Sequence, residues 1–312
     1  MKFSAITLLS AAGLTLVVGC SNSHDTSNSS KEPTVHSTPR VETQSSFVSR
    51  PLDKFAPTNA QDGRLKQAEA AITNGCLRKL GYSQHPLSEK PAPDQSSNIY
   101  EFYWFPDAAR TGYSTPPQVP QGTSWDESVP SIQQGLLDGK TRSYKGNPVP
   151  KDGCYGEAGR RLTKNATPPD KFSEGGITIS RVADASPRGL IESYISVIRQ
   201  KLSFDIKQDS RVKKLMSQWS QCMSAEGYNY PSPAGAAGDN RWGNNGSKHP
   251  SKDEISAATT DMACKKKLRY LDVVIAVESA YETRYIEQHP GRVQEFIQLR
   301  TAWDKNAQRL TR

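Results

Sequence analysis

The sequence predicts a mainly α-helical protein with a small β element, in which disulfide bonds staple helical hairpins. Apolar residues recur at helical spacing along much of the chain, only two short segments favour strands, and four cysteines follow position 20. Apolar residues make up only 35% of the chain and the mean hydropathy is −0.69. We therefore expect a small core that gains stability from covalent cross-links.

The first 20 residues combine a short apolar segment with a cysteine. The uncharged run from Ile6 to Val18 has about 13 residues, whereas a membrane-spanning helix needs roughly 20. This length disfavours the alternative of a permanent signal anchor. The run ends in Val17-Val18-Gly19-Cys20, which resembles a bacterial lipobox. We expect residues 1–19 to be a lipoprotein signal peptide, and a lipid on Cys20 to hold the mature chain on the outer face of the cell membrane.

Residues 20–57 are expected to form a disordered tether. They are rich in Ser, Thr, Asn and Pro and have few large apolar side chains, so burial cannot offset the entropy of ordering them. A coil of this length would place the folded part about 30–35 Å from the lipid.

A mixed α+β unit with a proline-rich insert is expected over residues 58–184, with folded structure beginning near Asn59. One apolar helical stripe opens this unit and is followed by Gly81, a natural C-cap; the stripe consists of Leu65, Ala68, Ile72, Cys76 and Leu80.

The insert from Lys90 to Pro150 contains one dense aromatic cluster. This cluster, residues 99–105, is rich in β-favouring side chains and ends at Pro106, so it predicts a strand. A second strand is predicted over residues 176–180, and a short helix between Tyr155 and Leu162.

Residues 185–312 are expected to form a helical unit. Ser186-Pro187 is a helix start signal, and Asp209 or Ser210 can cap the next helix, which stops at Gly227. The segment 228–250 is rich in proline and glycine and reads as a loop.

The C-terminal part of this unit predicts one long helix and one further helix. Ser251 and Glu254 form a capping-box pattern that opens a long helix towards Gln288. His289-Pro290-Gly291 interrupts the helix, and a last helix follows.

The four remaining cysteines are expected to form two disulfides, since an even number in an exported chain is typical of disulfides. They are widely spaced and no histidines cluster with them, so we expect no metal site.

Four cysteines allow three pairings. The segments 76–82 and 222–228 both read Cys, a large aliphatic residue, three variable residues, Gly, Tyr, and each precedes one further cysteine in a helical context. This internal repeat selects the pairs Cys76–Cys154 and Cys222–Cys264.

A resemblance to a known group of proteins rests on the second repeat. The residues that carry it are Trp219-Ser220-Gln221-Cys222-Met223, Gly227-Tyr228, Glu254-Ile255, Ala258, Asp261 and Cys264-Lys265. This pattern resembles uncharacterised lipoproteins of actinobacteria, over roughly residues 187–312 and more loosely over 60–165. The resemblance implies an exported, lipid-anchored, helical protein with paired cysteines, and it offers no enzymatic activity to carry over to this chain.

The chain carries a formal charge of +8. Its basic runs are short, and three successive lysines at 265–267 on a helix point about 100° apart, so we expect a solvated helix surface rather than one basic patch. The excess is compatible with anionic lipids or an anionic cell-wall polymer, and we expect no nucleic-acid partner.

We expect no catalytic residues and no cofactor, because the chain contains none of the common catalytic or nucleotide-binding motifs. Asp261 and Lys265 are explained by an i,i+4 ion pair. The candidate ligand contacts are Tyr103 and Phe105, which share one face of the predicted aromatic strand. Packing of these rings in the core is the alternative.

These observations predict a lipid-anchored extracytoplasmic protein that acts as a binding or interaction module. An anionic cell-wall polymer or another envelope protein is the expected partner. The alternative is a cell-envelope enzyme with an unrecognised active site. A cleft lined by facing carboxylates, or a buried histidine, would favour the enzyme.

Overall fold

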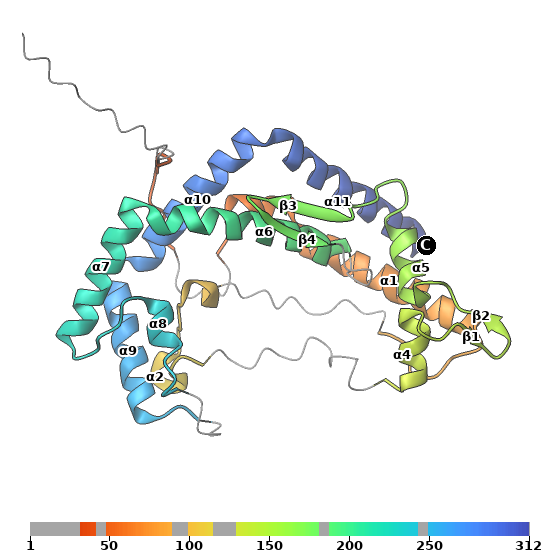
Figure 1. Cartoon of the computed structure of the whole chain (residues 1–312), viewed down its shortest axis with the longest axis horizontal. Helices are drawn as coiled ribbons and strands as arrows, with labels where there is room; N and C mark the ends of the chain where they lie inside the picture. The colour runs from red at the N-terminus through yellow and green to blue at the C-terminus, as the bar shows by residue number, and fades with distance from the viewer. Residues whose placement is uncertain are drawn as a thin grey trace, which may run out of the picture. The chain divides into compact units, whose positions relative to one another are not determined.

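The fold is mainly helical with a small β element, as predicted, and the β element of the described residues consists of two hairpins (Figure 1). The structure is a computed structural model that describes residues 32–41, 48–88, 99–114, 129–180, 187–242 and 249–311. The elements in chain order are η1 (Pro51–Phe55), α1 (Asn59–Lys79), η2 (Ile99–Phe102), α2 (Ala108–Thr111), α4 (Ser131–Asp138), β1 (Ser143–Tyr144), β2 (Asn147–Pro148), α5 (Gly153–Leu162), β3 (Lys171–Glu174), β4 (Ile177–Ser180), α6 (Pro187–Gln208), α7 (Ser210–Ala225), α8 (Pro233–Ala237), α9 (Lys252–Lys267), α10 (Tyr270–Gln288) and α11 (Pro290–Leu310). The predicted lipidation site Cys20 and the predicted helix start at Ser186 lie outside the described residues.

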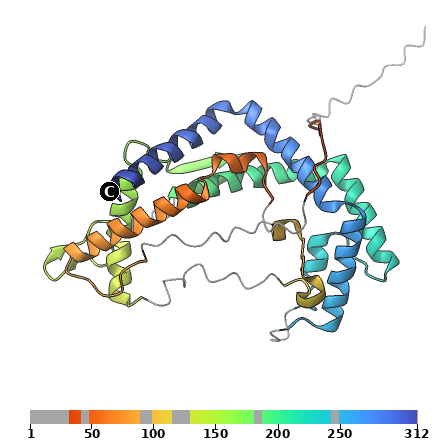
Figure 2. The ribbon, with the colours of Figure 1, turned by 180° about the vertical axis from the view of Figure 1, so that it is seen from behind.

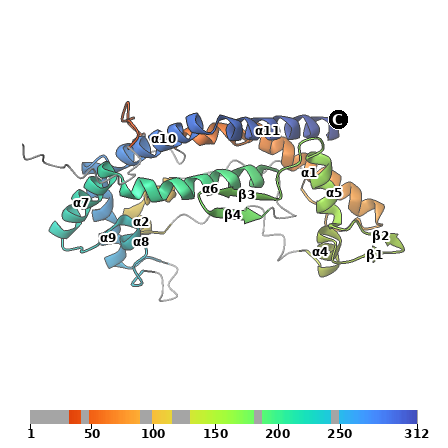
Figure 3. The same ribbon diagram turned by 45° about the horizontal axis from the view of Figure 1, so that its top comes forward.

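The largest core cluster lies between α1, α5, α6, α10 and α11. Helix α1 lies alongside α11 (Figure 2), and the antiparallel β3–β4 hairpin packs against α6 (Figure 3). In this cluster the ring of Phe172 stacks on Tyr194 at 4.5 Å, and both rings lie 6.0 Å from Phe296. The cluster takes residues from both 58–184 and 185–312, so the two predicted units share one core.

A second core cluster lies between η2, α2, α7, α8, α9 and the start of α10. Trp219 and Met223 of α7 are completely buried there, and Ala257 and Ala258 of α9 are completely buried in the same cluster. The small alanine side chains let α7 and α9 approach closely, with the Cys222–Cys264 bridge between them.

Both predicted disulfides are confirmed. Cys76 of α1 is bonded to Cys154 of α5, with a Cα–Cα distance of 5.6 Å. Cys222 of α7 is bonded to Cys264 of α9, with a Cα–Cα distance of 5.8 Å. Each bridge therefore joins two packed helices, as the predicted fold class requires.

The internal repeat encodes the same helix end twice. Gly81 and Gly227 adopt φ values of +84° and +87°, in the left-handed region that favours glycine. The N–H of the following tyrosine, Tyr82 or Tyr228, donates 2.9 Å back to a carbonyl five residues earlier, and the glycine N–H donates to the carbonyl three residues earlier. This pattern is the Schellman motif, so the repeat has a physical origin in both copies.

Ordered structure begins earlier than the sequence predicts. The 3₁₀-helix η1 buries Leu52 and Phe55 in the first core cluster, and the N–H of Val41 donates to Asp272 Oδ1 at 2.8 Å. Residues 33–41 and 48–57 therefore lie on the folded part, and the predicted tether over 20–57 is too long. Two apolar side chains three residues apart are enough to dock a single helical turn.

The strand predicted over residues 99–105 is wrong. Residues 99–102 form the 3₁₀-helix η2, and the chain then turns at Tyr103, whose φ is +54°. Trp104 and Phe105 are both buried, so the side chains do not alternate between two faces. The dense aromatic composition of the segment reflects its packing against helices in the second core cluster. Neither of the two described hairpins includes this segment.

Two helix predictions also need correction. The long helix predicted from Ser251 to Gln288 breaks between α9 and α10, where Arg269 has a φ of +52° and its Nε donates to Asp272 Oδ2 at 2.8 Å. No glycine or proline marks this break in the sequence. The segment 228–250, predicted as a loop, contains the short helix α8.

Candidate functional site

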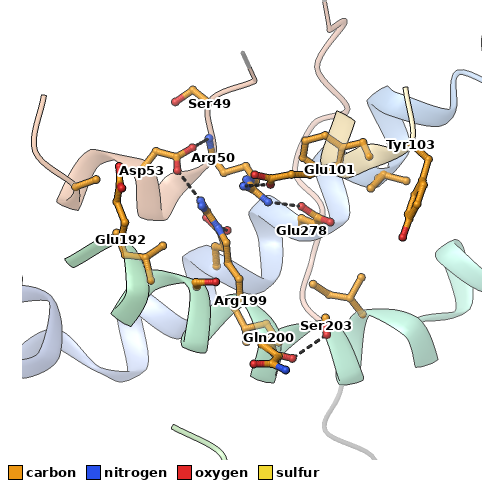
Figure 4. A pocket seen from close by; sticks show the side chains of 18 of the residues that line it. Ser49, Arg50, Asp53, Glu101, Tyr103, Glu192, Arg199, Gln200, Ser203 and Glu278 are labelled. Carbon is orange, nitrogen blue, oxygen red and sulfur yellow. Dashed lines mark hydrogen bonds and ion pairs between the residues drawn. The ribbon is translucent and has the colours of Figure 1, made fainter. Parts of the chain in front are cut away.

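A groove with a volume of about 1500 Å³ is the strongest candidate site in the described part of the chain (Figure 4). It is lined by residues of η1, η2, α6, α7, α8 and α10, which lie far apart in the sequence. The lining mixes apolar side chains, neutral polar side chains and charged groups of both signs.

Arg50 forms the centre of one charged network in the groove. Its side chain is only 7% exposed, and its guanidinium binds Glu101 at 3.0 Å and Glu278 at 3.2 Å. The guanidinium also lies 5.2 Å from the centre of the Phe102 ring. Burial raises the pKa of Glu278, and the charge of Arg50 opposes this shift. Figure 4 shows Arg50 between the two carboxylates.

Arg199 of α6 forms a second network of the same kind. Its Nε donates to Glu282 Oε1 at 2.8 Å, and its terminal nitrogen donates to Asp53 Oδ1 at 2.7 Å. The other oxygen of Glu282 accepts a hydrogen bond from the N–H of Leu52 at 2.8 Å. Burial alone would lower the pKa of Arg199, but the two carboxylates outweigh it and the pKa is raised. The network therefore fixes η1 to both α6 and α10.

This arrangement does not favour acid–base chemistry. Each arginine bridges two carboxylates, so four of the five carboxylates that line the groove are paired with a cation. No histidine or cysteine is among the residues that line the groove. The geometry supplies fixed hydrogen-bonding groups, which suits binding.

Tyr103 lines the groove beside this network. Its side chain is 38% exposed, although most large apolar side chains of the described residues are buried. A φ of +54° is unusual for a bulky residue and stores strain, so the surrounding structure must hold it. The N–H of Tyr103 donates to the carbonyl of Tyr100 at 2.9 Å, and its own carbonyl accepts a hydrogen bond from Lys265.

Lys265 belongs to a completely buried polar network under Tyr103. Its Nζ lies 2.7 Å from Asp261 Oδ2, and neither side chain has exposed surface. The other oxygen of Asp261 accepts a hydrogen bond from the indole of Trp219 at 2.7 Å. Burial raises the pKa of Asp261 and lowers the pKa of Lys265, because both charges lose hydration, and the pairing opposes both shifts.

The predicted i,i+4 pair of Asp261 and Lys265 is thus confirmed, but the prediction of a solvated surface fails for Lys265. Only Lys266 and Lys267 of the basic run are exposed. Trp219, Asp261 and Lys265 also belong to the pattern that resembles actinobacterial lipoproteins, so three of its residues form one hydrogen-bonded network that supports Tyr103.

The two predicted ligand contacts separate in the structure. Tyr103 lies in the groove, whereas Phe105 is only 5% exposed and packs edge-on against Tyr113, with ring centres 5.3 Å apart. Phe105 is therefore a core residue, because the segment is not a strand and the two side chains do not share a face.

Sequence reasoning missed the arginine–carboxylate networks. Arg50 and Asp53 fell in the predicted tether. A usable signal was present in α10, where Glu278 and Glu282 are like charges at i,i+4 and so require cations from elsewhere in the fold.

No known protein family, curated protein or solved structure matches this chain. Within the described ranges, none of the helices combines the length and apolar character needed to cross a membrane. The same residues contain no group of three or more His, Cys, Asp or Glu side chains placed to hold a metal ion.

Proposed function

We propose that this chain is a lipid-anchored extracytoplasmic binding module and that the groove is its binding site. The observation that carries the proposal is the strained, exposed Tyr103, which a buried ion pair holds at the edge of a groove with fixed polar groups. The lipobox pattern ending at Cys20 supports the anchor. The two disulfides are typical of proteins that fold outside a reducing compartment. The resemblance to actinobacterial lipoproteins belongs to this proposal.

The anchor is tested by replacing Cys20 with Ala in producing cells. We expect the variant to lose labelling by a fatty-acid analogue and to leave the membrane fraction, because the thiol that would carry the lipid is gone. The wild-type chain serves as the control in the same fractionation. Equal labelling of both chains would rule out Cys20 as the lipidation site.

Binding by the groove is tested with the mature chain, in which Cys20 is replaced by Ser so that the protein carries no lipid. We expect this protein to co-sediment with purified cell-wall sacculi, and Tyr103→Gly to reduce the bound fraction about tenfold. Glycine tolerates a positive φ, so this variant removes the ring and leaves the backbone conformation available. Tyr103→Phe keeps the ring and should bind as the wild type does.

Phe204 offers a matched control for loss of an exposed ring. It is 60% exposed and is not among the residues that line the groove. We expect Phe204→Ala to retain binding. Equal sedimentation of Tyr103→Gly and wild-type protein would refute the groove as the wall-binding site.

A further inference from the structure

The charges that line the groove nearly balance. Five carboxylates and four cationic side chains are among its lining residues, which gives a net charge of about −1. Arg50 and Arg199 each already bind two carboxylates. Lys54 and Lys207 lie outside these pairs, but a strongly anionic ligand would also meet the five carboxylates, and a strongly cationic ligand would meet the two guanidinium groups. The groove therefore suits an uncharged ligand.

The remaining polar lining is rich in groups that bind hydroxyls. Besides two tyrosines, seven lining residues carry uncharged hydroxyl or carboxamide side chains, among them Gln200, Ser203 and Ser232. A carboxylate that binds arginine through one oxygen keeps lone pairs that can accept a hydrogen bond from a ligand O–H. Glu101 is such a group, because it binds Arg50 through Oε2 and its side chain is 60% exposed.

Tyr103 adds a flat apolar surface to this polar lining. The face of an aromatic ring carries a partial negative charge, so it attracts the weakly positive C–H hydrogens on the face of a sugar ring. In Figure 4 the Tyr103 side chain points away from the carboxylate of Glu101, which turns towards Arg50, so the two groups would contact different units of a sugar chain. The backbone around Tyr103 is fixed by Lys265, which lowers the entropy cost of binding.

The size of the groove points to a chain of several units. Its volume of about 1500 Å³ exceeds the roughly 300–1000 Å³ of typical small-molecule sites. We infer that the groove binds an uncharged glycan chain, with the ring of Tyr103 against the face of one sugar and the exposed, arginine-bound Glu101 accepting a hydroxyl of another. This inference rests on the proposed function and specifies its ligand class. It replaces the anionic cell-wall polymer with an uncharged one as the ligand of the groove.

Calorimetric titration of the mature Cys20→Ser chain tests the inference. The uncharged probes are maltohexaose, chitohexaose and mannohexaose, and the charged probes are hexalysine and polyphosphate. We expect at least one uncharged hexasaccharide to bind more tightly than both charged probes. Its affinity should fall about tenfold in Tyr103→Gly and stay within about twofold in Tyr103→Phe and Phe204→Ala. Raising the salt from about 50 to about 500 mM should change the affinity less than about twofold, because no ion pair forms.

The other outcomes overturn the inference in distinguishable ways. Tighter, salt-sensitive binding of hexalysine or polyphosphate would show that the ligand is charged. If none of the three hexasaccharides binds while sedimentation with sacculi still depends on Tyr103, the ligand class is wrong and the proposed function stands. If sedimentation also fails to depend on Tyr103, the groove is not a binding site and both proposals fall.

Discussion

Replacing Lys265 with Met should lower the free energy of unfolding by about 3–5 kcal/mol at neutral pH, because it leaves the Asp261 carboxylate buried without a cation. In the wild-type chain Lys265 Nζ lies 2.7 Å from Asp261 Oδ2, and both side chains are completely buried. Among the described residues, the indole of Trp219 would remain as a hydrogen-bond donor to Asp261. Denaturant unfolding followed by tryptophan fluorescence measures the change.

The loss of stability in Lys265→Met should increase as the pH rises. Burial already raises the pKa of Asp261, and removing Lys265 raises it further. An acid whose pKa is higher in the folded than in the unfolded state binds more protons when folded, so stability falls as the pH rises above the unfolded value of about 3.9. We expect the gap between variant and wild type to be larger at about pH 8 than at about pH 4.5.

Two further variants separate the buried pair from a general effect of losing a lysine. Lys266→Met removes an exposed neighbour on the same helix and should change stability by less than about 0.5 kcal/mol. Adding Asp261→Asn to Lys265→Met should restore much of the loss, because the amide oxygen can still accept from Trp219 without a buried charge. Equal losses in Lys265→Met and Lys266→Met would contradict a special role for the buried pair.

Local signals in the sequence predicted the parts of the fold that depend on neighbouring residues. The Cys-x-x-x-x-Gly-Tyr repeat predicted both helix ends, because a Schellman motif lies within seven residues. The order of the four cysteines along the two repeats then predicted both disulfide pairs, although the paired cysteines are 78 and 42 positions apart. The aromatic density of residues 99–105 indicated burial correctly. It did not determine the conformation, because buried aromatics occur in strands and in 3₁₀-helices alike.

The candidate site depends on contacts between distant residues, which a single sequence does not reveal. Arg50 and Glu278 are separated by 228 positions, and Arg199 and Asp53 by 146. Tyr103 was the one groove residue that could be predicted, because a large aromatic side chain in a polar insert is visible locally. The sequence places its partner Lys265 in a basic run that was expected to be solvated. In the fold, Lys265 is buried and donates a hydrogen bond to the carbonyl of Tyr103.

Removing either disulfide should lower the free energy of unfolding by several kcal/mol. The loss should be larger for Cys76–Cys154 than for Cys222–Cys264. The chain-entropy treatment gives about 4 kcal/mol for the Cys222–Cys264 bridge, which closes a separation of 42 residues, and about 4.5 kcal/mol for the Cys76–Cys154 bridge, which closes 78. We expect Cys264→Ser to lower the melting temperature by about 10 °C. Differential scanning calorimetry on the Cys20→Ser background measures the change.

Thiol reactivity distinguishes loss of one bridge from general unfolding. In Cys264→Ser the released thiol of Cys222 is part-buried on α7 and should react with a maleimide, whereas Cys76 and Cys154 should remain bonded and unreactive. The reciprocal variant Cys154→Ser should release only the thiol of Cys76, which is 3% exposed and should react more slowly than Cys222 does. This variant should melt at a lower temperature still, because the longer loop is released. Peptide mapping of unreduced wild-type protein provides the reference. A Cys76–Cys222 peptide, or four reactive thiols in the native protein, would contradict the pairing and the two stapled helix pairs that depend on it.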